Sequence, residues 1–529
     1  MTHHADGPSG RRDDPPAWLG WASLAAFAVL WWARWPSLPL GLDPAYHLFV
    51  AREMLAAGGP FLSETWQYAP VGRAHLYPPG LHVLLAGLMG LGLDPLLVIR
   101  LVCAGLPVAL LGALYAAARR MADEQVAVSC LWAALVPTAF WVHSATALAA
   151  TMALGLWLWW MVAVQERRWR AAGALFVLLG YTHLALPWIA LLAALLAGCW
   201  DPGARAWWRK GIWAMTALLP WYLHVLRHRA VIHVVPRLEN AFVDVMPALW
   251  ALAAVGAVAV CRRAARARRG WWLAAWLAAG FCAWRWPYRW LNGEGMLPVL
   301  LMAGAGLAEC ARRLSPVLAR FRGGGRPGLG PWTMAAGLLF GLLIMSPTLS
   351  HGPSGWRWVW PDSTPAHLLR LAARSNSLEP LLPDGYRAEL VRRVKGASLP
   401  GEPLWANAPY AAGQVAALAG RPLSMAMLTE VGPWRMFDPI AQAPLVLWFK
   451  LAPDPQFADI RQLNGYALQL VAEDEISVLW RQTGAAVQVP PPRAVMPLAA
   501  ALALAGALAV TAGWQGEWRG ARQPCAARL

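Results

Sequence analysis

Residues 96–118 of the chain read LLVIRLVCAGLPVALLGALYAAA, and this stretch decides the class of fold. Its 23 positions contain one charged residue, Arg100. A helix of this length is about 34 Å long, which is enough to cross the roughly 30 Å hydrocarbon core of a bilayer. Comparable apolar stretches recur along most of the 529 residues. The sequence therefore predicts a membrane protein that crosses the bilayer many times.

The overall composition agrees with this class and excludes several others. Hydrophobic residues make up 58% of the chain and charged residues 14%, the mean hydropathy is +0.42, and there are 35 tryptophans. Soluble proteins average about 45–50% apolar and about 25% charged residues. None of the seven cysteines falls in a loop predicted to lie outside the cell. Disorder, a collagen-like repeat and a disulfide scaffold are therefore excluded.

The positions of the basic residues give the orientation of the predicted spans. Basic clusters such as 262–269 and 312–326 fall inside when the N-terminus is placed in the cytoplasm, whereas the long loop 351–493 carries 13 basic and 12 acidic residues. The net charge of +17 is therefore the positive-inside signal of a membrane protein and predicts no nucleic-acid partner. Twelve spans are expected at residues 17–35, 96–118, 126–141, 146–164, 171–184, 185–199, 211–226, 244–260, 271–288, 295–311, 332–349 and 494–512.

These spans divide the chain into five parts. A cytoplasmic tail (1–16) precedes a transmembrane domain (17–350) with a large first outer loop at 36–95. An extracytoplasmic α/β domain (351–493), a final transmembrane helix (494–512) and a second cytoplasmic tail (513–529) follow. Within 351–493 we expect helices at 365–374 and 386–395, and a strand pair at 467–471 and 476–480 around an acidic turn. The stretch 320–331 is rich in glycine and is expected to be a cytoplasmic linker.

The first outer loop contains most of the polar residues that point to chemistry. Asp43-Pro44 is typical of a helix start, and the helix should end at Gly58. Both this helix and the apolar stretch 80–92 are too short to cross a bilayer, so we expect them to lie along its surface. Asp94-Pro95 has the same pattern and is expected to be only a helix cap. His47 follows Asp43 by one helical turn, and Glu64, His75 and Tyr77 come downstream.

The order of these motifs resembles the GT-C superfamily of membrane glycosyltransferases. The matching features are Asp43-Pro44-x-Tyr46-His47 after a first span, Tyr77-Pro78-Pro79, and Arg100 at the start of the next span with Arg119-Arg120 at its end. The motifs that carry the resemblance lie in residues 17–200, whereas the later spans resemble the family only in their arrangement along the chain. It implies an all-α polytopic membrane protein of about twelve transmembrane helices plus interfacial helices, with a small α/β extracytoplasmic domain near the C-terminus. It also implies an inverting glycosyltransferase with a polyprenyl-phosphate-linked sugar donor.

Two departures from the family pattern narrow the expected reaction. The family's oligosaccharyltransferases have an acidic second outer loop, whereas the equivalent Trp141–Thr146 has no acid. They also carry an acid in a W-W-D-Y-G-type motif, which Trp405–Tyr410 lacks. Transfer of a single sugar, or a diverged relative without activity, therefore fits better than transfer of a preassembled oligosaccharide. Partners implied by the family are the lipid-linked donor, membrane lipid, and a glycan, lipid or protein acceptor.

Candidate catalytic residues follow from what the transfer needs. A hydroxyl acceptor is a weak nucleophile, so one carboxylate should act as general base. The family position indicates Asp43, the alternative being a helix cap, and Glu64 is the second candidate. His47 either binds a divalent cation such as Mg²⁺ or Mn²⁺ together with Asp43 or only hydrogen-bonds it, and His143 is a further possible ligand.

Candidate substrate-binding residues should meet a phosphate or a sugar. His224, Arg227 and His228 share one face at the outer end of a predicted span and suit a phosphate. The alternative is that they are interfacial basic residues. Arg289 contacts phosphate or pairs with Glu294, and Trp405 is a candidate for stacking on sugar. His75 and Tyr77 are assigned to the same binding site, and His183 is expected to be a buried, hydrogen-bonded histidine.

Two other classes of function stay open on the sequence alone. Twelve spans are also common among transporters and flippases, although no internal repeat is found and the polar residues gather at the outer face. A non-catalytic scaffold of the same fold is the other alternative. The abundance of Arg, Ala and Trp with few Lys suggests a bacterial inner membrane, with the active site facing the periplasm.

Overall fold

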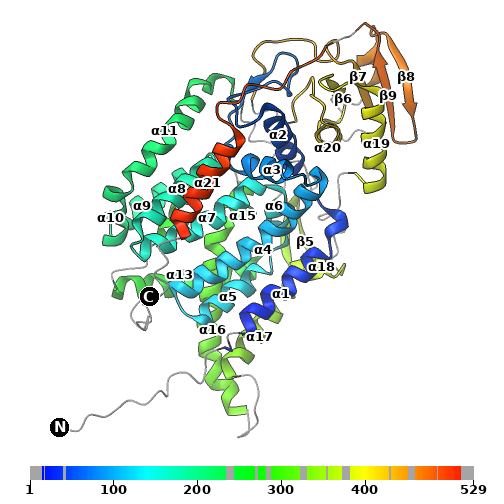
Figure 1. Ribbon diagram of the computed structural model, residues 1–529. Coiled ribbons are helices and arrows are strands. Elements are labelled where there is room, and N and C mark those ends of the chain that lie inside the picture. Colours follow the sequence, from blue (N-terminus) through cyan, green and yellow to red (C-terminus); the bar gives the residue numbers. More distant parts are fainter. Residues whose placement is uncertain are drawn as a thin grey trace, which may run out of the picture.

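The computed structural model describes residues 15–16, 18–39, 43–233, 243–267, 272–280, 287–321, 330–352, 355–371, 382–427, 431–450, 459–484 and 487–513. Most of them form a helical body, and a small α/β unit (Asp384–Gln482) lies at one end of it (Figure 1). The predicted linker and most of both predicted tails fall outside these residues.

Nine helices of the described chain are apolar and candidates to lie in a membrane. Four are long enough to cross it by length and composition: Pro95–Met121, Leu148–Gln165, Pro247–Ala265 and Arg289–Arg320. The five shorter ones are Trp18–Trp32, Gly80–Gly90, Leu186–Gly198, Pro331–Ile344 and Leu498–Ala512. The prediction of a mostly helical protein with several apolar candidate spans is therefore confirmed.

The body runs through α1 (Trp18–Trp32), α2 (Asp43–Ala57), α3 (Gly80–Gly90), α4 (Pro95–Met121), α5 (Glu124–Ala134), α6 (Thr138–Thr146), α7 (Leu148–Gln165), α8 (Trp169–Thr182), α9 (Leu186–Gly198), α10 (Pro202–Lys210) and α11 (Ile212–Arg227). It continues through α13 (Pro247–Ala267), α14 (Trp272–Gly280), α15 (Pro287–Leu291), α16 (Met296–Phe321), α17 (Pro331–Ile344) and, after the α/β unit, α21 (Leu498–Gly513).

The helices expected in the first loop are present. α2 starts at Asp43 and ends at Ala57 before Gly58, and α3 has 11 residues, too few for a crossing. A Cβ on Gly80 would lie 2.7 Å from the Tyr181 carbonyl oxygen, so the glycine lets α3 begin directly against the end of α8. The Asp94 carboxylate accepts hydrogen bonds from the backbone N–H groups of Leu96 and Leu97, as predicted for a cap.

The stretch expected as one span at 126–141 is instead two helices. α5 ends at Ala134 and α6 starts at Thr138, with Pro137 between them. Proline disfavours helical geometry in the residue before it, here Val136. The Val136 carbonyl oxygen instead accepts a hydrogen bond from the Thr364 N–H at 2.9 Å, so the break also holds a segment more than 200 residues away.

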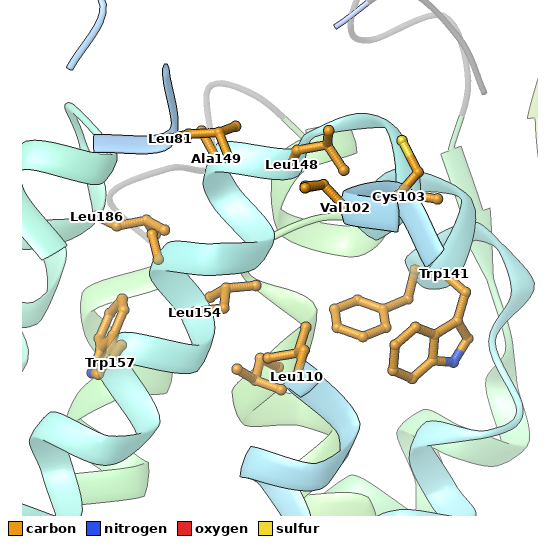
Figure 2. Close-up of a cluster of buried hydrophobic side chains, with 14 of the residues drawn as sticks. Leu81, Val102, Cys103, Leu110, Trp141, Leu148, Ala149, Leu154, Trp157 and Leu186 are labelled. Atoms are coloured by element: carbon orange, nitrogen blue, oxygen red, sulfur yellow. The ribbon is translucent and has the colours of Figure 1, made fainter. Parts of the chain in front are cut away.

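Tight helix packing shapes the centre of the body. A Cβ on Gly256 of α13 would lie 1.8 Å from the Met302 carbonyl oxygen of α16, and one on Gly306 would lie 2.0 Å from the Leu252 carbonyl oxygen. Small residues allow such close approach between membrane helices. Figure 2 shows the adjoining apolar core, where side chains from α3, α4, α6, α7 and α9 pack together.

Besides the helices, the chain forms a three-stranded and a four-stranded sheet. β3 (Val243–Val245), β4 (Thr348–Gly352) and β5 (Gly355–Val359) form an antiparallel sheet in that order. The α/β unit has the strand order β6-β7-β9-β8, made of β6 (Leu404–Ala406), β7 (Leu445–Phe449), β8 (Leu468–Glu473) and β9 (Ser477–Gln482). The predicted strand pair is confirmed as the β8–β9 hairpin, whose turn is capped by Asp474.

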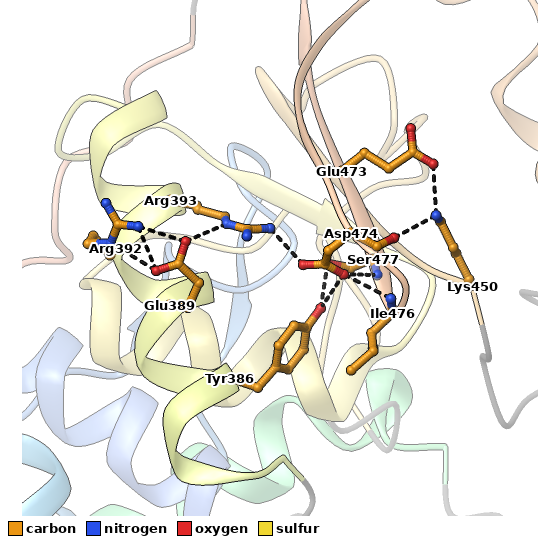
Figure 3. A network of polar contacts seen from close by, with 9 residues as sticks. All are labelled: Tyr386, Glu389, Arg392, Arg393, Lys450, Glu473, Asp474, Ile476 and Ser477. Carbon is orange, nitrogen blue, oxygen red and sulfur yellow. Dashed lines mark hydrogen bonds and ion pairs between the residues drawn. The ribbon is translucent and has the colours of Figure 1, made fainter.

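Helix α19 (Asp384–Ala397) packs beside this hairpin, close to the predicted 386–395. Figure 3 shows the polar contacts: Arg393 Nη1 pairs with Asp474 Oδ2 at 2.6 Å, and Tyr386 Oη donates to Ser477 Oγ at 2.6 Å. The other expected helix is the short α18 (Thr364–Leu368), and the rest of 365–374 is only partly described. Within the unit, α20 (Pro409–Ala419) packs against α19 and β6, and it also contacts α2 of the body.

Candidate active site

The first turns of α2 supply the residues that sequence reasoning placed at the centre of the site. Asp43 is half-buried at the first position of the helix, and the residue before it lies outside the described chain, so capping is not described. Tyr46 and His47 are both buried. Because α2 packs against α3, α4 and α20, this helix lies between the helical body and the α/β unit.

His47 joins α2 to α3 through a second histidine. Its Nδ1 lies 3.0 Å from Nε2 of His82, and both rings are buried. The Tyr77 ring lies 5.1 Å from His47 and 5.6 Å from His82, which places the Tyr77-Pro78-Pro79 motif against the pair. Burial, with a smaller contribution from His183, lowers the pKa of His47 to about 3. The imidazole is therefore neutral at physiological pH.

Glu64 is the centre of a separate, fully occupied network. Its carboxylate accepts hydrogen bonds from Arg73 Nε at 2.6 Å and Gln67 Nε2 at 2.9 Å, and lies 2.5 Å from His75 Nδ1. Burial alone would raise the pKa of Glu64, but Arg73 and His75 outweigh it and lower the pKa to about 2. A carboxylate with these partners is a weak base and a strong structural anchor.

The same loop is fixed to α2 by Glu53. One oxygen of this carboxylate accepts hydrogen bonds from the N–H groups of Thr65 and Trp66, at 2.8 and 2.9 Å. Burial and the nearby Glu64 raise the pKa of Glu53 well above its usual value. At the turn between β1 (Ser63–Glu64) and β2 (Arg73–Ala74), Gly72 has φ +74°, and a Cβ there would lie 2.6 Å from the Glu64 carbonyl oxygen.

The end of α11, which carries His224 and His228, reaches this loop. His224 Nε2 lies 3.0 Å from the His75 carbonyl oxygen, and the rings of His224 and His228 are 4.7 Å apart. Arg227 is exposed and forms no ion pair with any residue that the structure describes. The end of α11 therefore offers one exposed guanidinium beside two histidines, of which His224 contacts the loop.

Glu294 forms a second buried polar cluster. Arg289 Nη1 donates to its Oε1 at 3.0 Å, His183 Nε2 lies 3.7 Å from Oε1, and His143 Nε2 lies 3.6 Å from Oε2. Arg289 is thus half of an ion pair, one of the two roles expected for it. His183 is buried as predicted, and its Nδ1 accepts hydrogen bonds from the N–H groups of Ala185 and Leu186.

Trp405 lies in the core of the α/β unit. It is 3% exposed on β6 and stacks with Trp448 at 6.4 Å between ring centroids. In this position its indole faces protein, and neither face is open to a sugar.

The donor atoms for a metal ion do not converge in the described residues. In this part of the chain no three side chains of His, Cys, Asp or Glu are grouped as ligands, and His47 Nδ1 is occupied by His82. The candidate set of Asp43, His47 and His143 therefore does not fit a preformed Mg²⁺ or Mn²⁺ site.

Sequence reasoning missed Arg73, His82, Gln67 and Glu53 as parts of the site. His82 was visible as the last residue of the Tyr77–His82 run, but its partner lies on another helix. Arg73 and Gln67 flank Glu64 by nine and three residues, and only the fold of the β1–β2 loop brings them to one carboxylate.

Solved structures with a similar fold identify the architecture. ArnT from Cupriavidus metallidurans matches in the apo state with a TM-score of 0.54 and 17% identity, over 89% of this chain and 99% of ArnT. The same enzyme bound to undecaprenyl phosphate matches with a TM-score of 0.52.

Two other solved structures, with lower sequence identity, also have a similar fold. The archaeal oligosaccharyltransferase AglB from Archaeoglobus fulgidus, in complex with an inhibitory peptide and a dolichol-phosphate, matches with a TM-score of 0.53 and 13% identity, over 88% of this chain and 74% of AglB. The arabinofuranosyltransferase AftD from Mycobacteria matches at 0.50 and 15%, over 88% of this chain and 40% of AftD. No protein-family model matches the sequence, and no curated protein matches it significantly. Over most of its length the protein nevertheless has the fold of the GT-C glycosyltransferases.

Proposed function

We propose that the protein transfers a sugar from a polyprenyl-phosphate-linked donor to an acceptor, at the extracytoplasmic face of a bacterial inner membrane. The observation that carries this proposal is the shared fold with ArnT and AglB, structures of which were solved with undecaprenyl phosphate and dolichol-phosphate, respectively. A carboxylate at the start of α2, one helical turn before the buried His47–His82 pair, supports it within this chain.

Asp43 is the proposed general base. It is half-buried, whereas Glu64 has a pKa held at about 2 by its partners and is the weaker candidate. In the reaction, the acceptor hydroxyl oxygen attacks the anomeric carbon from the face opposite the phosphate. Asp43 takes the hydroxyl proton, the bond from the anomeric carbon to the phosphate oxygen breaks, and the phosphate leaves with both electrons. The anomeric configuration is inverted.

The donor phosphate needs positive charge or hydrogen-bond donors, both when the donor binds and when the phosphate departs. We assign this role to Arg227 and His228 at the end of α11, with His224 holding the adjacent loop. Their geometry supports the assignment, because Arg227 is exposed and His224 already contacts the backbone of His75. Arg289 is a second candidate, since its side chain is 41% exposed even while it pairs with Glu294.

The proposed arrangement crosses the membrane several times, with both termini in the cytoplasm. In this arrangement α2 and α3 lie on the outer surface under the α/β unit. The position of that unit beside α2, and of the basic ends of α4 and α16 toward the opposite end of the molecule, supports it (Figure 1).

A direct test measures transfer of sugar from a labelled polyprenyl-phosphosugar by the purified chain in proteoliposomes. Turnover that depends on Asp43 supports the proposal. A donor that moves across the bilayer without losing its sugar would indicate a flippase instead.

A further inference from the structure

Two exposed tryptophans, Trp356 and Trp358, lie on β5, and a third, Trp360, directly follows the strand. Trp356, Trp358 and Trp360 have exposed fractions of 57%, 62% and 54%. Successive side chains of a strand point to opposite faces, so residues two apart share a face. Trp356 and Trp358 therefore project from the same side of an edge strand, with the exposed Trp360 just past its end, where a soluble surface would carry polar residues.

The rest of this sheet has two unlike faces. Trp358 stands opposite Leu349 on β4, and Trp356 stands opposite His351, with their ring centroids 4.9 Å apart. The other face carries Thr348 and Ser350, which are buried against the body. The sheet thus has one face packed on protein, and a second face that is covered at Val243 of β3 but exposed at the two tryptophans of β5.

The tryptophan row continues an apolar surface on α17. Met334, Leu338, Leu342 and Met345 are 44–62% exposed, and their spacing of four, four and three residues places them on one side of that helix and its end. Trp360 Nε1 donates a hydrogen bond to the Met345 carbonyl oxygen at 2.9 Å. The three indoles therefore begin where this exposed stripe ends.

We propose that the tryptophan face of the β3–β4–β5 sheet lies in the interfacial region of the lipid bilayer, as a membrane-contacting ribbon. Tryptophan is enriched where hydrocarbon meets lipid headgroups, because its ring is apolar and its N–H needs a polar partner. A continuous apolar stripe on an adjoining membrane helix selects lipid, rather than a soluble partner, as the occupant. The ribbon thereby fixes the depth at which α17 and β3 sit, independently of sugar transfer.

Site-directed spin labelling tests this placement in the full chain reconstituted in lipid vesicles. The seven native cysteines are replaced, and single cysteines are introduced as Trp356→Cys, Trp358→Cys and, as the matched control on the opposite face, Arg357→Cys. Leu342→Cys serves as the lipid reference and Arg392→Cys as the aqueous reference. Gel filtration and the unfolding temperature check that each variant is folded.

The expected result is an alternating pattern. Labels at 356 and 358 collide with oxygen nearly as often as the label at 342, and are shielded several-fold from an aqueous nickel complex relative to 392. The label at 357 is not enriched in oxygen contact. Equal exposure of 358 and 392 to the nickel complex overturns the proposal, because the face then lies in water. Protection of 358 from both reagents also overturns it, because protein then covers the face.

Discussion

His47 on α2 and His82 on α3 lie 3.0 Å apart, Nδ1 to Nε2, and are both buried. A neutral imidazole has one donor and one acceptor nitrogen, so a hydrogen bond between the two requires complementary tautomers. Protonation of His47 would put a proton on both of its nitrogens and a charge in a dry site. The junction of α2 and α3 at His47 and His82 is therefore built for the neutral form.

This junction predicts a loss of stability in acid. The pKa of His47 is lowered from 6.5 to about 3 in the folded protein, so the unfolded chain binds the proton more readily. The contribution to folding is complete above pH 6.5 and falls as the pH drops toward 3. We expect the unfolding temperature to decrease between pH 6.5 and 4.5, and His47→Gln to flatten that decrease. If the unfolding temperature of His47→Gln fell with pH as steeply as that of the unchanged protein, the acid sensitivity would come from groups other than His47.

Glu64→Gln should destabilise the protein strongly. The substitution leaves the Arg73 guanidinium buried, at 2% exposure, without its counter-charge. Removing one partner of a buried pair costs about 3–5 kcal/mol. Glu473→Gln is the control, because its pair with Lys450 is solvent-exposed and worth about 1 kcal/mol or less. Thermal unfolding in detergent measures both. Normal stability with lost transfer would contradict the structural role and make Glu64 a reacting group.

The double variant Arg227→Ala with His228→Ala should raise the KM for the donor with little change in kcat. The lost contacts bind the phosphate before and during the reaction, so binding weakens more than chemistry. One charged hydrogen bond is worth about 1.5–3 kcal/mol, hence an increase of roughly tenfold or more. Arg320→Ala, at the end of α16, is the control. An unchanged KM would mean that the α11 residues only meet the membrane interface.

Orientation can be tested by labelling from outside the cell. A cysteine introduced as Arg392→Cys on α19 should react with a membrane-impermeant reagent. One introduced as Arg313→Cys on α16 should react only after the cells are opened. Both side chains are exposed, 77% and 72%, so access depends on the side of the membrane. The reverse pattern would place the α/β unit in the cytoplasm.

Local signals in the sequence were sufficient to predict helix α2 and the β8–β9 hairpin. Asp43-Pro44 and Gly58 mark the ends of α2, and the β8–β9 hairpin follows from alternation around an acidic turn. The split of the expected 126–141 span has a local sign as well, Pro137, but apolar character on both sides concealed it.

The site itself was only partly predictable, because its contacts are long-range. His82 and His47 are 35 residues apart and meet through the packing of two helices. The stacking role expected for Trp405 ignored its strand, β6, all three residues of which are buried in the α/β unit. A pattern of residue types can nominate Asp43 or Glu64, but only the fold shows that Glu64 is already paired.

The most direct measurement is sugar transfer by Asp43→Asn in proteoliposomes. Asparagine caps a helix about as well as aspartate, so the folded, inserted protein should be preserved, but the amide cannot take a proton. General-base assistance is worth about 10²–10⁴ in rate, and a loss of that size is the predicted result. Asp94→Asn, which changes the cap of α4 in the same way, should leave transfer unchanged. Near-normal transfer by Asp43→Asn would contradict the account, because Asp43 would then be a structural residue only.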